Sequence, residues 1–355
     1  DMFLFNDDYN REYNFPNVSE QLTKALISKK ELKPDIPILF ITDEINNFYG
    51  VYESKHIKEL KENNINVVIT DNEKIRDSNP LYAGFWRTAV KWFGVEGKGW
   101  LPNPFSPDSE KVTLRGYLKL LNFKANHRKV IITDKAGIVT SANPHDGSGY
   151  HSNIAFKVEG KILQELMESE IKVAEFSGYE NKNFYFKEEG VISRDTDTSV
   201  TLITEGKIRD SLITAINETS EGDNITIGMF YLAHRNTIES LINASNRGVN
   251  VKLILDPNKD AFGLEKNGIP NRQVAQELRE KTNNQIQVKW YDTHGEQFHT
   301  KMVFIEKQNE SIIIGGSANL TRRNIDDYNL ETNLLIKTKS DTKFNNDIKK
   351  YFNRI

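Results

Sequence analysis

Two short blocks of the same residue types lie far apart in this chain of 355 residues, and both suit phosphoryl chemistry. The first begins with His127-Arg128-Lys129 and ends with Ser141-Ala142-Asn143. The second begins with His299-Thr300-Lys301 and ends with Gly316-Ser317-Ala318-Asn319. Alternate residues of a strand point to the same face, so each His should project together with its Lys. Two such pairs facing each other predict one phosphodiester site, in which one His attacks, the other protonates the leaving group, and both Lys neutralise phosphate oxygens.

This pattern resembles the signature of the phospholipase D superfamily, H-x-K-x4-D followed by G-S-x-N, which is present twice in its two-domain members. The second copy has Glu306 in place of the Asp, and the first copy has Asp134 there but Thr140 where the family usually has Gly. The resemblance implies chemistry that uses no metal or other cofactor. The alternative is two unrelated hairpins with buried, hydrogen-bonded histidines, but two complete copies favour a shared site.

Length and composition indicate a two-domain enzyme. A chain of 355 residues is longer than the chains that usually fold around one hydrophobic core, which suggests two domains of roughly 150 to 200 residues. A hydrophobic content of 37% with 27% charged residues is typical of soluble, folded proteins. The net charge of -3 argues against a protein that coats polyanions, although a local basic groove is compatible with it. The absence of Cys excludes disulfides, a thiol nucleophile and a Cys-based zinc site.

No apolar run approaches the ~20 residues that span a bilayer, so the membrane association that a lipid substrate implies is expected through a surface. The chain begins at Asp1, so we expect that an upstream segment was removed, either a signal or anchor or simply a chosen boundary. This predicts a membrane-associated or extracytoplasmic location. A monomer is expected, since one chain carries both half-sites.

The repeat extends beyond the two blocks. Residues 37–43 and 251–256 both read as buried strands that end in an acid, Asp43 and Asp256. In each half a helix and a second strand follow before the catalytic strand. This alternation predicts an α/β fold of two similar α/β/α halves, each a mixed sheet flanked by helices, related by pseudo-two-fold symmetry.

The domain plan follows from a polar stretch at residues 178–198. It predicts an N-terminal half at 1–185 and a C-terminal half at 190–355, with the site at their interface. The catalytic strands, 130–132 and 302–305, are expected to be buried apolar runs.

Residues 72–126 form an insertion that the second half lacks, and it contains three of the four Trp. One interpretation is that its aromatics pack the insertion onto its own domain. The other is a wall for acyl chains or a surface that enters a bilayer, since Trp favours the membrane interface. A basic amphipathic stretch at 111–124 suits an anionic lipid surface, with a solvated helix face as the alternative. The candidate substrate-binding residues are Trp86, Trp92, Trp100 and Arg115.

The two histidines need distinct roles. A carboxylate on one ring nitrogen fixes the tautomer and stabilises positive charge, which favours a nucleophile. In the resembled family such an acid lies about a dozen residues past the Asn and reaches the opposite half, which implies Glu331 for His127. Ungapped alignment places Ala155 opposite Glu331 and Asn153 opposite Asn329, so only Asn153 or Ser152 can substitute in the first half. We therefore predict His127 as nucleophile and His299 as general acid, then base.

Supporting roles are expected for further motif residues. Asp134 and Glu306 come at the far end of buried strands and should hold backbone or a Lys. The small-residue turns should donate hydrogen bonds to phosphate oxygens; their candidate donors are Ser141, Asn143, Ser317 and Asn319. His145 and His151 are expected to be exposed loop residues, and no remaining His has spacing that suggests a metal site.

The reaction predicted is cleavage of a phosphodiester through a phosphohistidine. Water as acceptor gives hydrolysis of the phospholipase D type, and a lipid alcohol gives transfer of the cardiolipin synthase type. The expected partners are a phospholipid substrate and the membrane surface. The alternative is a nuclease or nucleotide phosphodiesterase with the same two-histidine site, for which a basic, aromatic groove would bind single strands. A degenerate binding module is disfavoured by intact His, Lys and Asn in both copies.

Overall fold

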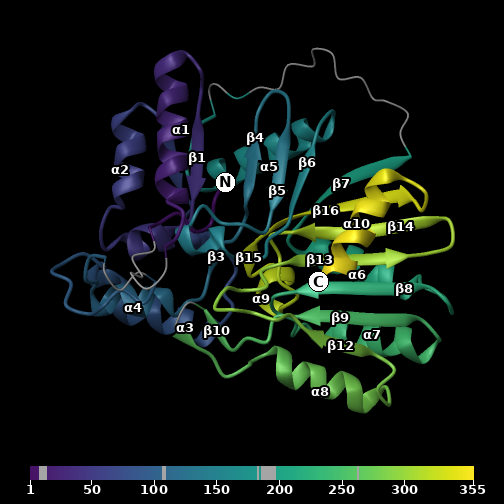
Figure 1. The fold of residues 1–355 in the computed structure, drawn as a ribbon. Helices are drawn as coiled ribbons and strands as arrows, with labels where there is room; N and C mark the ends of the chain where they lie inside the picture. Colours follow the sequence, from purple (N-terminus) through teal and green to yellow (C-terminus); the bar gives the residue numbers. More distant parts are fainter. Residues whose placement is uncertain (8–13, 106–108, 182–183, 185–196, 262–263) are drawn as a thin grey trace.

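The C-terminal half is built on a seven-stranded mixed sheet with strand order β12-β9-β8-β13-β14-β16-β7. The computed structural model describes residues 1–7, 14–105, 109–181, 184, 197–261 and 264–355 (Figure 1). The strands are β7 (Thr198–Thr204), β8 (Asn224–Met229), β9 (Asn250–Leu255), β12 (Gln287–Trp290), β13 (Lys301–Glu306), β14 (Glu310–Gly316) and β16 (Thr332–Lys339). The pairs β8–β9 and β9–β12 are parallel, whereas β13 is antiparallel to both β8 and β14.

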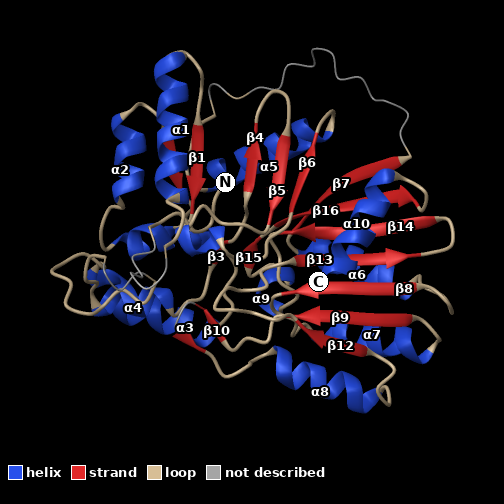
Figure 2. Cartoon of the chain, in the orientation of Figure 1, coloured by secondary structure: helices blue, strands red, loops and turns tan. Residues whose placement is uncertain are grey.

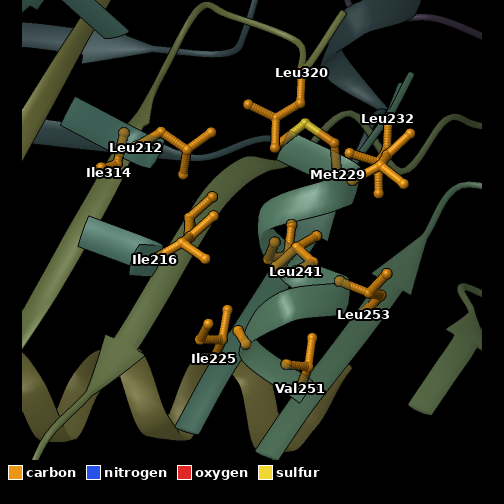
Figure 3. Packing of buried hydrophobic residues seen from close by; sticks show 14 of the residues in the cluster. Leu212, Ile216, Ile225, Met229, Leu232, Leu241, Val251, Leu253, Ile314 and Leu320 are labelled. Carbon is orange, nitrogen blue, oxygen red and sulfur yellow. The ribbon is translucent and has the colours of Figure 1, made fainter. Parts of the chain in front are cut away.

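Both faces of this sheet are buried, because its strands alternate apolar side chains between two cores. Ile225, Leu253 and Ile314 lie in the core under the helices α6 (Gly206–Asn217), α7 (Arg235–Asn246) and α8 (Asn271–Lys281), and Figure 3 shows this packing. Met302 and Phe304 point to the opposite face, where α10 (Lys343–Arg354) and strands of the first half cover them. Such two-sided burial accounts for the continuous apolar run in β13.

The first half repeats this order in shorter elements. The parallel pair β1 (Leu39–Thr42) and β2 (Asn66–Ile69) corresponds to β9 and β12, and the antiparallel strands β4 (Val130–Ile132), β5 (Gly137–Thr140) and β6 (Ala155–Val158) correspond to β13, β14 and β16. Met2 bridges β1 in parallel and Lys129 in antiparallel fashion, as Met229 does for Leu255 and Lys301. The start of the chain therefore takes the place of β8.

Helices flank the strands of both halves (Figure 2). In the first half these are α1 (Val18–Leu32), α2 (Lys55–Glu62) and α5 (Ile162–Phe176). The predicted α/β class with mixed sheets flanked by helices is confirmed. One detail of the prediction is wrong: Ile131 in β4 is exposed, because it points away from buried Val130 to a face that nothing covers at this position.

The two halves meet through one shared core and one shared strand pair. Phe156 and Val139 of the first half pack in a single cluster with Phe304 and Leu334 of the second. The short strands β3 (Ala125–Asn126) and β15 (Asn329–Leu330) pair in parallel across the halves. The expected boundary at residues 178–198 falls mostly outside the described residues, so the limits 1–185 and 190–355 remain a proposal.

The insertion is helical and projects beside the sheets at the lower left of Figure 1. It contains α3 (Pro80–Phe85), a π turn at Trp86–Val90, a 3-10 turn at Lys91–Phe93 and α4 (Leu114–Leu120). Nine of the fifteen exposed large hydrophobic side chains in the described chain lie between residues 81 and 123, which marks this segment as the most apolar surface. Within the described residues, no helix has both the length and the apolarity needed to cross a bilayer.

Candidate active site

Each predicted histidine is held by the opposite half of the molecule. His127, just after β3, places Nδ1 2.9 Å from an oxygen of Glu331, and His299, just before β13, places Nδ1 2.9 Å from Oδ1 of Asn153. Carboxylate and amide oxygens only accept, so Nδ1 carries the proton in both rings and Nε2 keeps its lone pair. Neither Nε2 makes a hydrogen bond within the described part of the chain. Both imidazoles therefore present a free nitrogen.

The two predicted lysines are buried without a counter-ion. Lys129 donates to the carbonyl of His127 at 2.8 Å, and Lys301 donates to the carbonyl of His299 at 3.2 Å. Among the described residues, no carboxylate lies within salt-bridge distance of either ammonium. Burial lowers the pKa of Lys129 to about 7, against the attraction of Glu331 and Asp43. Two buried ammonium groups with free donors form a site for an anion.

The two His-Lys pairs lie close enough that the lysine of one half lowers the pKa of the histidine in the other. Burial lowers the pKa of His127 to about 4, and the charge of Lys301 in the other half contributes to this decrease. Burial likewise holds the pKa of His299 well below its usual value, with further repulsion from Lys301, Lys129 and His127. With these lowered pKa values both imidazoles are neutral at pH 7, so a nucleophile is ready, and a bound anion would have to raise the pKa of the acid.

The serines of the two motif turns support the residues that hold the histidines. Ser317 donates to Glu331 and accepts from the N–H of Thr332 at 3.0 Å. Ser141 donates to Asn153 at 3.2 Å and accepts from the N–H of Ile154 at 3.0 Å. Each hydroxyl proton is used in these contacts, so both serines orient the histidine partners here, and the phosphate contact that the sequence suggested stays a prediction.

The two motif asparagines are free to meet a ligand. The side-chain oxygens of Asn143 and Asn319 are buried, and neither has a hydrogen-bond partner within the described residues. An unpaired buried amide atom is costly unless a bound molecule or water satisfies it. Since O and N of an amide are interchangeable in such assignments, both side chains remain candidates to donate to phosphate oxygens.

The ungapped alignment of the halves is off by two residues after the asparagine turn. Asn153 follows Asn143 by ten residues, whereas Glu331 follows Asn319 by twelve. The strand register pairs Thr140 with Ala155 and Gly316 with Asn333, which places Asn153 opposite Glu331. The shorter connection in the first half explains why the alignment put Ala155 there.

The acids of the motif lie at the other ends of their strands, away from the histidines. Glu306 pairs with Lys349 on α10 at 2.7 Å, which ties β13 to the helix that covers it. Asp134 is exposed in the turn between β4 and β5 and takes part in no hydrogen bond of the described residues. The expected contact to backbone or Lys is thus present for Glu306 and absent for Asp134, because the short hairpin ends before any neighbour reaches its tip.

The candidate substrate residues of the insertion differ in exposure. Trp92 and Trp100 are 81% and 65% exposed, whereas Trp86 is only 4% exposed and lines a pocket with Tyr49. Arg115 donates to the carbonyls of Gly94 and Glu96 at 2.7 Å and so holds the loop that carries Trp100. Trp86 therefore packs the insertion onto its own domain, whereas Trp92 and Trp100 face solvent, and their contact with acyl chains or a bilayer stays a prediction.

Three contacts of the site were not anticipated from the sequence. Phe3 lies 4.6 Å from the ring of His127 and 4.9 Å from Lys129 Nζ, and Phe230 lies 5.1 Å and 5.4 Å from His299 and Lys301. The repeated dipeptide Met-Phe at residues 2 and 229 was the available signal. His151 is not an exposed loop residue as expected: its Nδ1 accepts from the N–H of Gln297, and its ring lies 5.9 Å from His299, because its loop folds across the interface.

Among the described residues, no group of three or more His, Asp or Glu has the geometry to hold a metal ion. The predicted residues that the structure does bring together are His127, Lys129, Ser317 and Glu331 around one imidazole, and His299, Lys301, Ser141 and Asn153 around the other.

Comparison with known proteins supports the assignment of this fold. Residues 212–355 match the family model described as cardiolipin synthase, PLD-like domain. The structure is similar to phosphatidylserine synthase from Haemophilus influenzae Rd KW20, with 13% identity and a TM-score of 0.55 over 96% of this chain and 85% of the other. Nuc from Salmonella typhimurium, a phospholipase D family member, matches 44% of this chain and 93% of its own at 17% identity, with a TM-score of 0.34. No curated protein matched the chain.

Proposed function

We propose that this chain is a member of the phospholipase D superfamily and that it is a phosphodiesterase or phosphatidyltransferase that acts on phospholipids through a phosphohistidine; the family model over residues 212–355 and the similar fold support this. One observation carries the proposal. Two imidazoles with free Nε2 atoms and two buried ammonium groups without counter-ions surround a single site. A phosphodiester supplies the missing negative charge and the electrophile that such an arrangement requires.

The proposed first step uses His127 as nucleophile. Its Nε2 attacks the phosphorus, the bond to the leaving oxygen breaks, and that oxygen takes the proton from Nε2 of His299. The positive charge that develops on His127 is stabilised by Glu331, which is fully buried and bound to Nδ1. Lys129 and Lys301 neutralise the non-bridging oxygens.

The second step reverses the role of His299. Now neutral, its Nε2 removes a proton from water or from an acceptor alcohol, whose oxygen attacks the phosphohistidine and breaks the nitrogen–phosphorus bond. The pKa of His299, held low by burial and by the neighbouring cations, rises when the anionic phosphoryl group is bound. This makes the same nitrogen an acid in the first step and a base in the second.

Phospholipid is the substrate class that the insertion favours. The insertion exposes Phe85, Trp92, Phe93 and Trp100, and a concentration of exposed aromatic side chains in one segment favours an interaction surface. Residues 72–126 contain nine Lys or Arg and five Asp or Glu, a net charge of +4 in a chain whose net charge is -3. Aromatic side chains with a positive surround suit the interface of an anionic membrane.

The second candidate is a nuclease or nucleotide phosphodiesterase with the same chemistry. The same exposed tryptophans favour it, since nucleobases stack on aromatic rings in a basic groove. Incubation with a mixed lipid extract and, separately, with labelled single-stranded DNA decides between the two. We expect release of a head group or a transferred phosphatidyl product; cleavage of the DNA alone would replace our assignment.

Surface variants test the membrane contact apart from the chemistry. Trp92→Ser with Trp100→Ser should weaken binding to vesicles of anionic phospholipid and slow lipid turnover at least about tenfold, while turnover of a small soluble phosphodiester is retained. Leu32→Ser is the matched control, because Leu32 on α1 is equally exposed but lies outside the insertion. Equal losses on both substrates, or equal losses in the control, would contradict a membrane role.

A further inference from the structure

A buried aspartate at the end of the corresponding strand in each half holds the backbone directly before a histidine of the site. Asp43, after β1, accepts from the N–H of Asn126 at 2.7 Å, and Asn126 precedes His127. Asp256, after β9, accepts from the N–H of Phe298 at 2.7 Å, and Phe298 precedes His299. The two hydrogen bonds have the same length, although 83 residues separate Asp43 from Asn126 and 42 residues separate Asp256 from Phe298.

Each carboxylate also accepts hydrogen bonds from a second backbone N–H and from an asparagine side chain. The other oxygen of Asp43 accepts from the N–H of Ile45 at 2.8 Å, and that of Asp256 accepts from the N–H of Asn258 at 2.7 Å. An asparagine amide adds a further bond to each: Asn72 to Asp43 and Asn258 to Asp256, both at 2.9 Å. Burial raises the pKa of Asp43 to about 7 and raises that of Asp256 above its usual value, and the hydrogen-bond donors oppose both increases. Because three donors and no acceptor surround each group among the described residues, its hydrogen bonds are satisfied only in the carboxylate form.

The two aspartates also provide negative charge behind the lysines. Burial lowers the pKa of Lys129, and Asp43 opposes this decrease together with Glu331. Burial and Lys129 lower the pKa of Lys301, and Asp256 opposes this together with Glu331. The imidazoles of His127 and His299 also face the two ammoniums, and that of His151 faces Lys301. Each half-site thus has one aspartate that fixes the strand and compensates its lysine.

We propose that Asp43 and Asp256 are a symmetric pair of positioning residues, Asp43 for His127 and Lys129, and Asp256 for His299 and Lys301. The proposal deepens the proposed function and rests on it. A hydrogen bond to the backbone of the residue before each histidine fixes the position of that histidine's Cα and so of its imidazole. A displacement of a catalytic group by about 1 Å costs on the order of 10²-fold in rate. Loss of the charge removes part of what keeps the neighbouring lysine protonated at neutral pH.

The variants Asp43→Asn and Asp256→Asn keep the shape of the side chain but remove its charge and one acceptor. We expect each to lower kcat at least about tenfold, with a smaller change in KM. The alkaline limb of the kcat/KM profile should move to lower pH by about one unit, since an opposite charge near the lysine is lost. Asp146→Asn is the matched control: Asp146 is buried and accepts from the N–H of Ser19, but it contacts neither histidine strand.

Leaving-group dependence separates the two aspartates. Asp43→Asn should slow formation of the phosphoenzyme with every substrate, because it displaces the nucleophile. Asp256→Asn should spare this step for substrates with good leaving groups and slow it for poor ones, because it displaces the acid. If both variants lose rate without a pH shift and without leaving-group dependence, the pair is merely structural and the proposal is overturned.

A binding measurement keeps the inference independent of turnover. Sulfate binding, followed by calorimetry from pH 6 to 9, reports the protonation of Lys129 and Lys301 even if the chain cleaves no phospholipid. We expect Asp43→Asn to lose sulfate at lower pH than the unmodified chain, and an unchanged profile would refute the proposal. If Asp43→Asn does not fold, Asn72→Ala serves instead, since it removes one donor from the carboxylate and should shift the profile in the same direction.

Discussion

The two halves of the site share a frame but differ at the residue that holds the histidine. In both, a strand-end aspartate fixes the backbone before the histidine, a phenylalanine lies beside it, and a serine orients its partner. The partner itself is a carboxylate for His127, Glu331, and a neutral amide for His299, Asn153. The symmetric repeat therefore places both histidines in the same way, and the charge of Glu331 distinguishes their proposed roles as nucleophile and general acid.

That single charge has a direct electrostatic consequence. Burial lowers the pKa of both imidazoles, but Glu331 opposes the decrease at His127, where the pKa is about 4, and nothing comparable acts at His299. A carboxylate stabilises the cation that forms when His127 bonds to phosphorus, whereas an amide leaves His299 ready to lose its proton. The comparison predicts different failures when the two sides are altered.

The largest expected effect comes from removal of either imidazole. His127→Ala and His299→Ala should each lower turnover of a natural diester by at least about 10³-fold. Only His299→Ala should still form a phosphoenzyme with a substrate that has a good leaving group, since that step needs no acid. Acid-quenched mass spectrometry of the protein distinguishes the two. A stable adduct on His299, with His127 dispensable, would reverse the assignment.

Exchange of the two partners sharpens the comparison. Glu331→Gln keeps an acceptor for His127 Nδ1 but removes the charge, and should lower kcat by about 10²-fold or more; loss of a triad carboxylate in serine proteases costs about 10⁴. Single-turnover kinetics should place the loss in adduct formation. An unchanged rate of that step would remove Glu331 from the mechanism.

The reverse exchange should have a smaller effect. Asn153→Asp places a carboxylate on Nδ1 of His299 and should raise its pKa by about 1 to 3 units. In the complex, where the bound phosphodiester has already raised the pKa of His299, a further increase makes it a weaker acid, which should slow cleavage of poor leaving groups by about tenfold and leave good ones unaffected. Rates across a series of phenyl leaving groups measure this, and a uniform decrease would point to distortion of the site.

The pH dependence tests whether the buried lysines carry charge. The pKa of Lys129 is lowered to about 7, so its ammonium form is present below that pH and lost above it. The value of kcat/KM, which reports the free enzyme, should therefore fall by up to about tenfold per unit above pH 7. His127 stays neutral down to about pH 4 and should impose no loss in this window. A flat profile to pH 9 on a soluble diester would contradict the lowered pKa.

The sequence revealed the motif residues because the repeat preserves their spacing. It did not reveal which residues of the two halves are equivalent where the connections between strands differ in length. Glu331 was predicted to reach His127, and the structure has that contact, whereas the alignment missed that Asn153 occupies the same place. A connection shorter by two residues hides this equivalence. Asp43 and Asp256 were visible as acids at strand ends, but their contacts to Asn126 and Phe298 span the fold and carry no local signal.

The smallest expected effect concerns the position before each motif serine, where the halves have Gly316 and Thr140. Gly316 has φ 156°, and a Cβ there would meet the carbonyl oxygen of Thr332 at 2.4 Å, so Gly316→Ala should destabilise by about 1 to 3 kcal/mol. Thr140 instead donates to the carbonyl of Ile154 at 2.6 Å and accepts from the N–H of Ala142, so Thr140→Gly should cost about 1 to 2 kcal/mol through those lost bonds and added chain entropy. Urea unfolding midpoints measure both. An unchanged unfolding midpoint for Gly316→Ala would show that the backbone of Thr332 can move aside and that the close approach does not require glycine.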